Sequence, residues 1–280
     1  MRLTPYLPGP FRGATFDAPT PDALRRARML YNIDTVSVYG MENWSLARQD
    51  QLISALRANG MKLVLRLESY DPETFAFRST DAVRVVDRHS ALLNRIPKEL
   101  IAYVALNVPV DDPRVHERLG GVNSPAWRER QPGYVRELVA RTRAVTGDQV
   151  LLFPSLFYGW DGTYQIPIYR DSGADGWFIN SYSYPGGPNL INSPKLAAVL
   201  NRALAEYGPM PLVMEYGFHT NMSASQTAGQ LPSREAKRLA LLETTQFYAS
   251  VPNVCGTIYF GYDVNKMEGE PPALIDFGLV

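Results

Sequence analysis

Eight short runs of apolar, β-branched and aromatic residues recur along the chain, and longer segments with helical spacing separate them. Most of these runs are apolar at both odd and even positions, which is typical of parallel strands buried on both faces. The pattern therefore predicts eight buried strands. Their predicted ranges are Gly13–Asp17, Thr35–Tyr39, Lys62–Leu67, Leu100–Leu106, Val150–Ser155, Gly176–Tyr182, Pro211–Tyr216 and Cys255–Gly261.

The segments between the strands carry helix ends. A hydroxyl residue followed by proline marks three predicted starts, because the hydroxyl can cap free N–H groups and proline fits the first helical turn. These pairs are Thr20-Pro21, Ser124-Pro125 and Ser193-Pro194. Glycine marks three predicted stops, at Gly60, Gly147 and Gly208. The clearest helical spacing is that of Leu196, Val199, Leu200, Ala203, Leu204 and Tyr207.

Eight strands alternating with helices predict an α/β fold, a single (β/α)8 TIM barrel in which residues 1–280 form one domain. The alternative is a doubly wound sheet, which a glycine-rich phosphate loop after the first strand would support. The chain continues there with Ala18-Pro19-Thr20-Pro21, which is no such loop. After the eighth strand the chain includes Pro271-Pro272, so we expect the last helix to be short or missing.

Composition narrows the class of protein. Lys+Arg and Asp+Glu both number 28 in 280 residues, which argues against a nucleic-acid partner held through phosphates. No stretch approaches the roughly 20 apolar residues that cross a bilayer, and the first residues lack the apolar core of a secretion signal. We therefore expect a cytoplasmic protein with no membrane partner. The oligomeric state stays open.

Carboxylates, an amide and phenols follow the predicted strands, where barrel enzymes place their functional groups. They are Asp17, Tyr39, Glu68, Asn107, Tyr158, Tyr182, Tyr184, Glu215, Tyr259 and Tyr262, with Trp44, Trp127 and Trp160 in the following loops. Aromatic faces stack on sugar rings, and amides and carboxylates bind sugar hydroxyls, so this rim indicates a carbohydrate site. The alternative for each tyrosine is a half-buried position with a hydrated hydroxyl.

Glu215 is the most informative residue of this rim, because it directly follows the apolar run Pro211–Met214. Burying an unpaired carboxylate there would cost several kcal/mol, so we expect Glu215 to face an open, polar site. The alternative is a structural ion pair with an arginine such as Arg66.

Five stretches along the chain have the order and spacing of motifs in one group of enzymes. They are Phe11–Thr15, Tyr103–Pro109, Ser181–Tyr184, Met214–Gly217 and, faintly, Leu274–Leu279. In these stretches the chain resembles the clan A retaining glycoside hydrolases, which include cellulases, mannanases and many β-glycosidases. The resemblance implies that Glu215 is the nucleophile, that Asn107 binds the sugar 2-hydroxyl, and that Tyr182 or Tyr184 orients Glu215.

The chain departs from this group at Val108, where the group has its acid/base glutamate. Three interpretations follow. The acid can be relocated to Asp111 or Asp112, or to Glu68, whose place across the barrel would suit an inverting enzyme. The reaction can dispense with an acid, as transfer from activated donors does. The third interpretation is a degenerate barrel that binds carbohydrate or a partner protein without turnover.

Other residues add weaker candidates for the site. Tyr39, Trp160, His219 and Tyr259 are candidate sugar contacts, and Glu42 is either a sugar ligand or a solvated loop residue. No His or Cys cluster has metal-ligand spacing, so we expect neither a metal nor another cofactor. Cys255 fits a small apolar strand residue. The sequence thus predicts a glycosidase or transglycosidase acting on a β-linked carbohydrate or a glycosylated small molecule.

Overall fold

In the computed structural model the chain forms a closed barrel of parallel strands in the order β1-β2-β3-β4-β5-β6-β7-β8, with β8 paired to β1. The structure describes residues 11–17, 19–68, 78–106, 119–120, 124–157, 171–183, 194–208, 211–218, 247–248, 250–251 and 253–259. The strands are β1 Phe11–Phe16, β2 Thr35–Val38, β3 Lys62–Leu67, β4 Ile101–Leu106, β5 Leu152–Phe157, β6 Trp177–Ser183, β7 Leu212–Phe218 and β8 Val254–Tyr259. All eight predicted strands are confirmed, with ends displaced by at most two residues.

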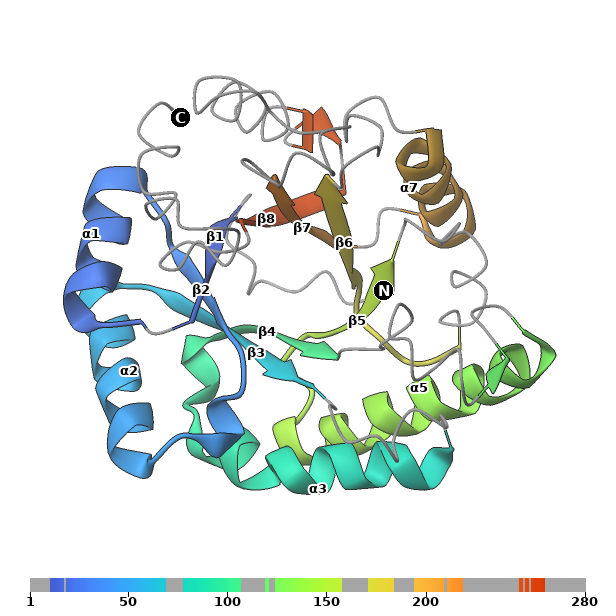
Figure 1. Ribbon diagram of the computed structural model, residues 1–280, viewed down its shortest axis with the longest axis horizontal. Helices are drawn as coiled ribbons and strands as arrows, with labels where there is room; N and C mark the ends of the chain where they lie inside the picture. The colour runs from blue at the N-terminus through green and yellow to red at the C-terminus, as the bar shows by residue number, and fades with distance from the viewer. Residues whose placement is uncertain are drawn as a thin grey trace, which may run out of the picture.

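Helices cover the outer surface of the barrel (Figure 1). They are α1 Pro21–Tyr31, α2 Leu46–Asn59, α3 Ser79–Arg95, α5 Pro125–Thr146 and α7 Pro194–Tyr207, with 3₁₀ turns η1 Met41–Asn43 and η3 Lys98–Leu100. The predicted (β/α)8 barrel is thereby confirmed. The segment expected to hold a short or missing last helix lies outside the described residues, and the one-domain assignment of residues 1–280 stays a prediction.

The predicted helix boundaries are also confirmed. Thr20 Oγ1 accepts a hydrogen bond from Ala23 N at 3.1 Å, and Ser124 Oγ accepts one from Trp127 N at 3.2 Å. The glycines at the predicted stops adopt positive φ angles, 61° at Gly60, 79° at Gly147 and 68° at Gly208. Of the predicted apolar positions in α7, Val199, Leu200 and Ala203 are buried, whereas Leu204 is 42% exposed.

Side chains of each strand alternate between two apolar layers. Along β3, Leu63, Leu65 and Leu67 pack in the layer between barrel and helices, whereas Val64 packs inside the barrel. Arg66 lies two residues after Val64, so the same alternation directs its side chain into the barrel interior.

Aromatic rings fill the interior below Arg66. Tyr103 stacks on Phe153 with ring centroids 4.8 Å apart, and Phe11 and Phe178 lie 6.2 Å and 6.5 Å from Tyr103. Burial raises the pKa of the Tyr103 hydroxyl well above its usual range. The barrel interior is therefore packed with side chains at this level.

The barrel closes where β1 lies between β2 and β8. Gly13 pairs with Thr35 on one side and with Ile258 on the other. A Cβ atom at Gly13 would lie 2.2 Å from Ile258 Cδ1 and 3.1 Å from the carbonyl oxygen of Thr35. The closing contact thus depends on the absence of a side chain at Gly13.

Candidate active site at the carboxyl ends of the strands

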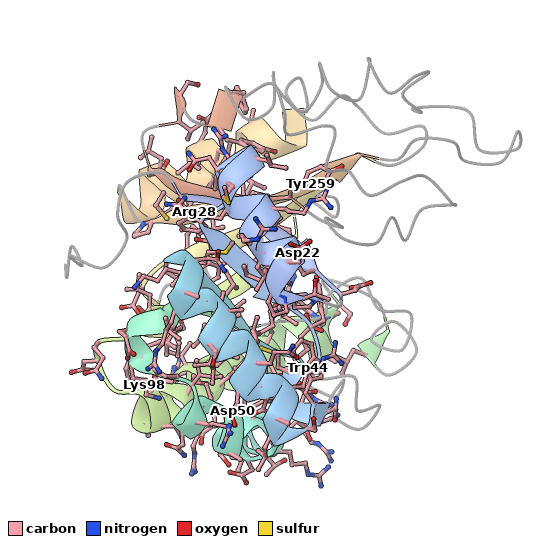
Figure 2. The ribbon with its side chains drawn as sticks, turned by 90° about the vertical axis from the view of Figure 1, so that its left-hand side faces the viewer. Asp22, Arg28, Trp44, Asp50, Lys98 and Tyr259 are labelled. Carbon is pink, nitrogen blue, oxygen red and sulfur yellow. The ribbon has the colours of Figure 1, made fainter. Side chains whose placement is uncertain are left out.

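The two ends of the barrel are easily told apart. Figure 2 shows Asp22, Trp44 and Tyr259 toward one end, and Arg28 and Lys98 toward the other. Asp22 lies in the first turn of α1 and Trp44 precedes α2, so their end is the one at which the strands finish and the following helices begin. Functional groups of parallel barrels gather at this end.

Arg66 is the centre of the candidate site. Its side chain is 3% exposed, and Nε donates a hydrogen bond to Ser37 Oγ on β2 at 2.7 Å. Ala105 of β4 is its strand partner on the other side. The hydrogen bond to Ser37 fixes the plane of the guanidinium, which leaves its two terminal nitrogens directed at other groups.

Glu215 of β7 forms an ion pair with Nη2 of Arg66. The carboxylate is 1% exposed, and its strand neighbours Val213 and Met214 are fully buried. Our expectation that Glu215 faces an open, polar site is therefore wrong, and the ion pair with Arg66 that stood as the alternative is present. A buried carboxylate in contact with a guanidinium is favoured in its ionised form.

Glu68 follows β3 directly and brings a second carboxylate to the same guanidinium. Its Oε1 lies 3.7 Å from Nη1 of Arg66, and its side chain is 2% exposed. This distance exceeds that of a hydrogen bond, so the attraction to Arg66 is electrostatic. Because residues two apart on a strand share a face, Arg66 and Glu68 point to the same side of the barrel wall.

Two aromatic rings flank the guanidinium. The Cζ atom of Arg66 lies 4.1 Å from the ring centroid of Tyr39 and 5.7 Å from that of Phe178. Both distances fall within the range of cation–π attraction. Tyr39 is half-buried, so part of this residue is accessible to solvent beside the buried ion pair.

The structure thus brings three sequence-predicted residues, Glu215, Glu68 and Tyr39, to one arginine. Tyr182 lies in β6, two strand positions beyond the pairing of Asn180 with Glu215, and its side chain is not described. Six further candidates lie outside the described residues: Asn107, Asp111, Asp112, Trp160, Tyr184 and His219. Their expected roles stay predictions.

Tyr259 is a correction to the predicted site. Its side chain is buried in the layer between barrel and helices, together with Phe16 and Val38. The neighbouring residue Ile258 packs inside the barrel instead. Because adjacent strand residues face opposite sides, Tyr259 points away from Glu215 and does not line the interior site.

Two other rim residues also belong to the structural framework. Trp127 is fully buried in α5, so the expectation that it lies in a loop is wrong. Glu42 of η1 is not the solvated loop residue of our alternative, since its side chain is 7% exposed, its Oε2 lies 3.6 Å from His89 Nε2 and its Oε1 lies 3.6 Å from Arg88 Nη2. Its expected role as a sugar ligand stays a prediction. This cluster joins the loop after β2 to α3.

Ser37 is the site residue that sequence reasoning missed. The alternation of Thr35 and Ser37 with Val36 and Val38 is a signal for it, because it places two hydroxyl groups on one face of β2. Thr15, the strand partner of Ser37 on β1, is a third buried hydroxyl residue beside this face.

Neither a metal ligand set nor a reactive thiol is found in the part of the chain that the structure describes. No group of three or more His, Cys, Asp or Glu residues there could hold a metal ion. Burial raises the pKa of the Cys255 thiol to about 12, and its Sγ lies 3.2 Å from the carbonyl oxygen of Leu212. Within the same ranges, no helix has the length and apolar character needed to cross a membrane.

Several solved structures with a similar fold are glycoside hydrolases. No protein-family model and no curated protein matches the chain. Among solved structures, a psychrophilic glycoside hydrolase family 10 endo-β-1,4-xylanase is similar with a TM-score of 0.60 at 11% identity, over 91% of this chain and 87% of the xylanase. A glucosidase from Croceicoccus marinus is similar with a TM-score of 0.59 at 10% identity, over 89% of this chain and 59% of the glucosidase.

A third structure matches over nearly its whole length. It is a family 128 (subgroup I) endo-β-1,3-glucanase from Amycolatopsis mediterranei in complex with laminaritriose, with a TM-score of 0.55 at 13% identity, over 96% of this chain and 99% of the glucanase. The chain spans only about three fifths of the glucosidase. At these identities the likeness shows a shared barrel fold.

Proposed function

We propose that this protein is a retaining glycosidase or transglycosidase acting on a β-linked carbohydrate or glycoconjugate, with Glu215 as its nucleophile. The observation that carries the proposal is the buried Glu215 carboxylate within β7, held by Arg66. The order of the family-like stretches along the sequence supports it. So does the likeness of the barrel to enzymes named as acting on β-1,4- and β-1,3-linked glycans.

The chemistry needs an ionised carboxylate that cannot turn away from the sugar. Contact with a guanidinium favours the ionised form, and the hydrogen bond from Arg66 to Ser37 restricts movement of the guanidinium. In the proposed first step, a carboxylate oxygen of Glu215 attacks the anomeric carbon, and the bond to the leaving oxygen breaks. Water or another hydroxyl then displaces Glu215 from the glycosyl ester.

The proposed test is covalent trapping. The protein is incubated with 2-deoxy-2-fluoro dinitrophenyl glycosides of several sugars, and its intact mass is recorded. Because dinitrophenolate leaves without protonation, this reaction needs only the nucleophile. We expect a stable mass increase that maps to Glu215 and that is absent from Glu215→Gln.

The competing function is a barrel that binds carbohydrate or a partner protein without turnover. The specific observation in its favour is Val108, which stands where the resemblance places the acid/base glutamate. Such a protein would form no adduct with any sugar of the panel. It would retain an oligosaccharide equally well before and after the Glu215→Ala substitution.

A further inference from the structure

The loop after β2, residues 39–44, carries one aromatic ring of the candidate site. Tyr39 is its first residue, and the ring of Tyr39 lies over the guanidinium of Arg66. Gly40 then turns the chain with a φ angle of 65°. The side chain of Met41 is buried in the layer between barrel and helices. The loop is therefore anchored in the core two residues after the ring that it presents.

The helix α2 holds this loop from one side. Nε2 of the buried Gln49 donates hydrogen bonds to the carbonyl oxygens of Met41 at 3.1 Å and Trp44 at 3.3 Å. The Cζ atom of Arg48 lies 3.6 Å from the ring centroid of Trp44. Because backbone carbonyl groups away from water need a donor, the bonds from Gln49 keep the start of η1 and the residue after it in one place.

Two residues of α3 hold the loop from the other side. His89 Nε2 lies 3.6 Å from one carboxylate oxygen of Glu42, and Arg88 Nη2 lies 3.6 Å from the other. The same Nη2 donates a hydrogen bond to Asn43 Oδ1 at 3.5 Å. The side chain of Glu42 is largely buried and that of His89 is fully buried. Each residue of η1 is thus held by α2 or by α3.

We propose that Glu42 is a positioning residue for Tyr39, a role that rests on the proposed glycosidase function. Both carboxylate oxygens of Glu42 face side chains of α3, so Glu42 acts on the site through the loop. Only two residues separate it from Tyr39, and a densely packed segment transmits a displacement instead of absorbing it. A displaced Tyr39 ring no longer lies over Arg66, which pairs with Glu215.

A double-mutant cycle on Glu42 and Tyr39 tests this role. The variants are Glu42→Gln, Tyr39→Ala and their combination, and the readout is the rate constant for labelling of Glu215 by the 2-deoxy-2-fluoro dinitrophenyl glycoside of the sugar that labels wild type. We expect Glu42→Gln alone to lower this rate constant about 10-fold, because small misplacements of reacting groups are costly. With Tyr39→Ala present, Glu42→Gln should change it by less than about two-fold, since no ring is left to displace.

Stability measurements separate positioning from a purely structural role. Urea unfolding gives the folded fraction of each variant, and labelling rates are compared per folded molecule. A Glu42 side chain that only stabilises the fold would lower the free energy of unfolding and leave the labelling rate of the folded protein unchanged. Coupling to Tyr39 in the labelling rate is therefore specific to positioning.

A matched control and a second variant complete the experiment. Asp50→Asn breaks the pair of Asp50 with Arg95, which also joins α2 to α3 but does not contact the loop, and it should leave labelling unchanged. Should Glu42→Gln fail to fold, Arg88→Met removes a half-exposed partner of Glu42. We expect the labelling rate to fall in Arg88→Met as well, and the loss to disappear when Tyr39→Ala is added.

The outcomes distinguish this inference from the proposed function. An equal loss on Glu42→Gln with and without the Tyr39 ring would show that Glu42 acts directly, as a sugar ligand would, and overturns the positioning role. No loss in either background overturns it as well. In both cases the adduct keeps Glu215 as the nucleophile. A wild-type chain that forms no adduct with any sugar of the panel overturns the proposed function and this role together.

Discussion

At the scale of single residues, Arg66 determines the character of the site. It is a cation between the apolar strand residues Leu65 and Leu67, and it is buried together with two carboxyl groups. Desolvating three ionisable groups is expensive, and the mutual attraction offsets that cost only while all partners are present. Such an arrangement favours a defined charge geometry over maximal stability.

The Arg66→Met substitution removes the cation and preserves much of the side-chain volume. Two buried carboxyl groups then lose the nearby charge of Arg66, and we expect the free energy of unfolding to fall by about 3–5 kcal/mol. Urea unfolding at pH 7 measures the change. The control Arg57→Met breaks the exposed pair with Glu99 and should cost about 1 kcal/mol or less. Equal losses in the two variants would show that Arg66 is not engaged as described.

The same residue shows what the sequence could reveal at this scale. Arg66 and Glu215 are conspicuous because each is a charged residue beside apolar strand positions. The sequence left two interpretations of Glu215 open, an open polar site or an ion pair with an arginine such as Arg66. Strand periodicity predicts which face of a strand a side chain lies on, but it does not predict which residue contacts it across the barrel. Tyr259 shows that the face itself is easily mispredicted. It lies one residue after Ile258 in β8, and this single position places its side chain in the outer layer and not in the barrel interior.

At the scale of elements, η1 is joined to α3 by the cluster of Glu42, Arg88 and His89. His89 Nδ1 lies 2.7 Å from the carbonyl oxygen of Val85, which can only accept, so Nδ1 carries a proton. Nε2 faces the Glu42 carboxylate at 3.6 Å. Because η1 begins two residues after Tyr39, this cluster also supports the ring that lies over Arg66.

The cluster predicts an acid-side pH dependence of stability. Burial raises the pKa of Glu42, but the contact with His89 and the charge of Arg88 together lower it below its usual range. A carboxyl whose pKa is lower in the folded state stabilises the fold above the unfolded-state pKa and loses that effect as pH falls. We expect the stability advantage of wild type over Glu42→Gln to be constant near pH 6–7 and to shrink below about pH 4.5.

Urea unfolding of wild type and Glu42→Gln between pH 3.5 and pH 7 measures this difference. Asp50→Asn provides a matched control, since Asp50 pairs with Arg95 at an exposed position. An advantage of wild type that stays the same across the whole pH range would contradict the assigned pairing.

Element boundaries were the most predictable level of this structure. A capping hydroxyl such as that of Thr20 and a positive-φ glycine such as Gly60 interact only with residues close to them in the chain. Both can therefore be recognised from the local sequence. Leu204 fits the apolar spacing of α7 yet is exposed, because burial depends on how a helix packs on the barrel.

At the scale of the whole molecule, closure of the barrel depends on Gly13. In Gly13→Ala the new methyl group would meet Ile258 Cδ1 at 2.2 Å and the carbonyl oxygens of Thr35 and Thr257 at 3.1 Å and 3.2 Å. We expect a loss of about 1–3 kcal/mol in the free energy of unfolding, as is typical of overpacking.

The Ile258→Val substitution removes the Cδ1 atom that the new methyl group would meet. The double variant Gly13→Ala/Ile258→Val should therefore be more stable than the sum of the single changes predicts. Gly60→Ala serves as the control, because nothing lies within 4 Å of a Cβ at that site and its effect should add to that of Ile258→Val. Additive losses for the Gly13 pair would rule out the steric contact at the closure.

The strand count and the alternation with helices were sufficient to predict the barrel. The sequence did not show that β1 and β8 meet through a glycine, because this contact joins residues from opposite ends of the described chain. The fold is similar to those of glycoside hydrolases at only 10–13% sequence identity, because many combinations of side chains can form the same packed layers of a barrel.

The pairing of β1 with β8 also has a consequence for folding during translation, because β8 is synthesised long after β1. Gly13 is synthesised roughly 240 residues before its partner Ile258, and translation adds about 5–20 residues per second. The edge of β1 that pairs with β8 therefore has no partner strand for about 12–50 s. During that interval the unsatisfied backbone groups on this edge of β1 are a surface that chaperones or neighbouring nascent chains can engage.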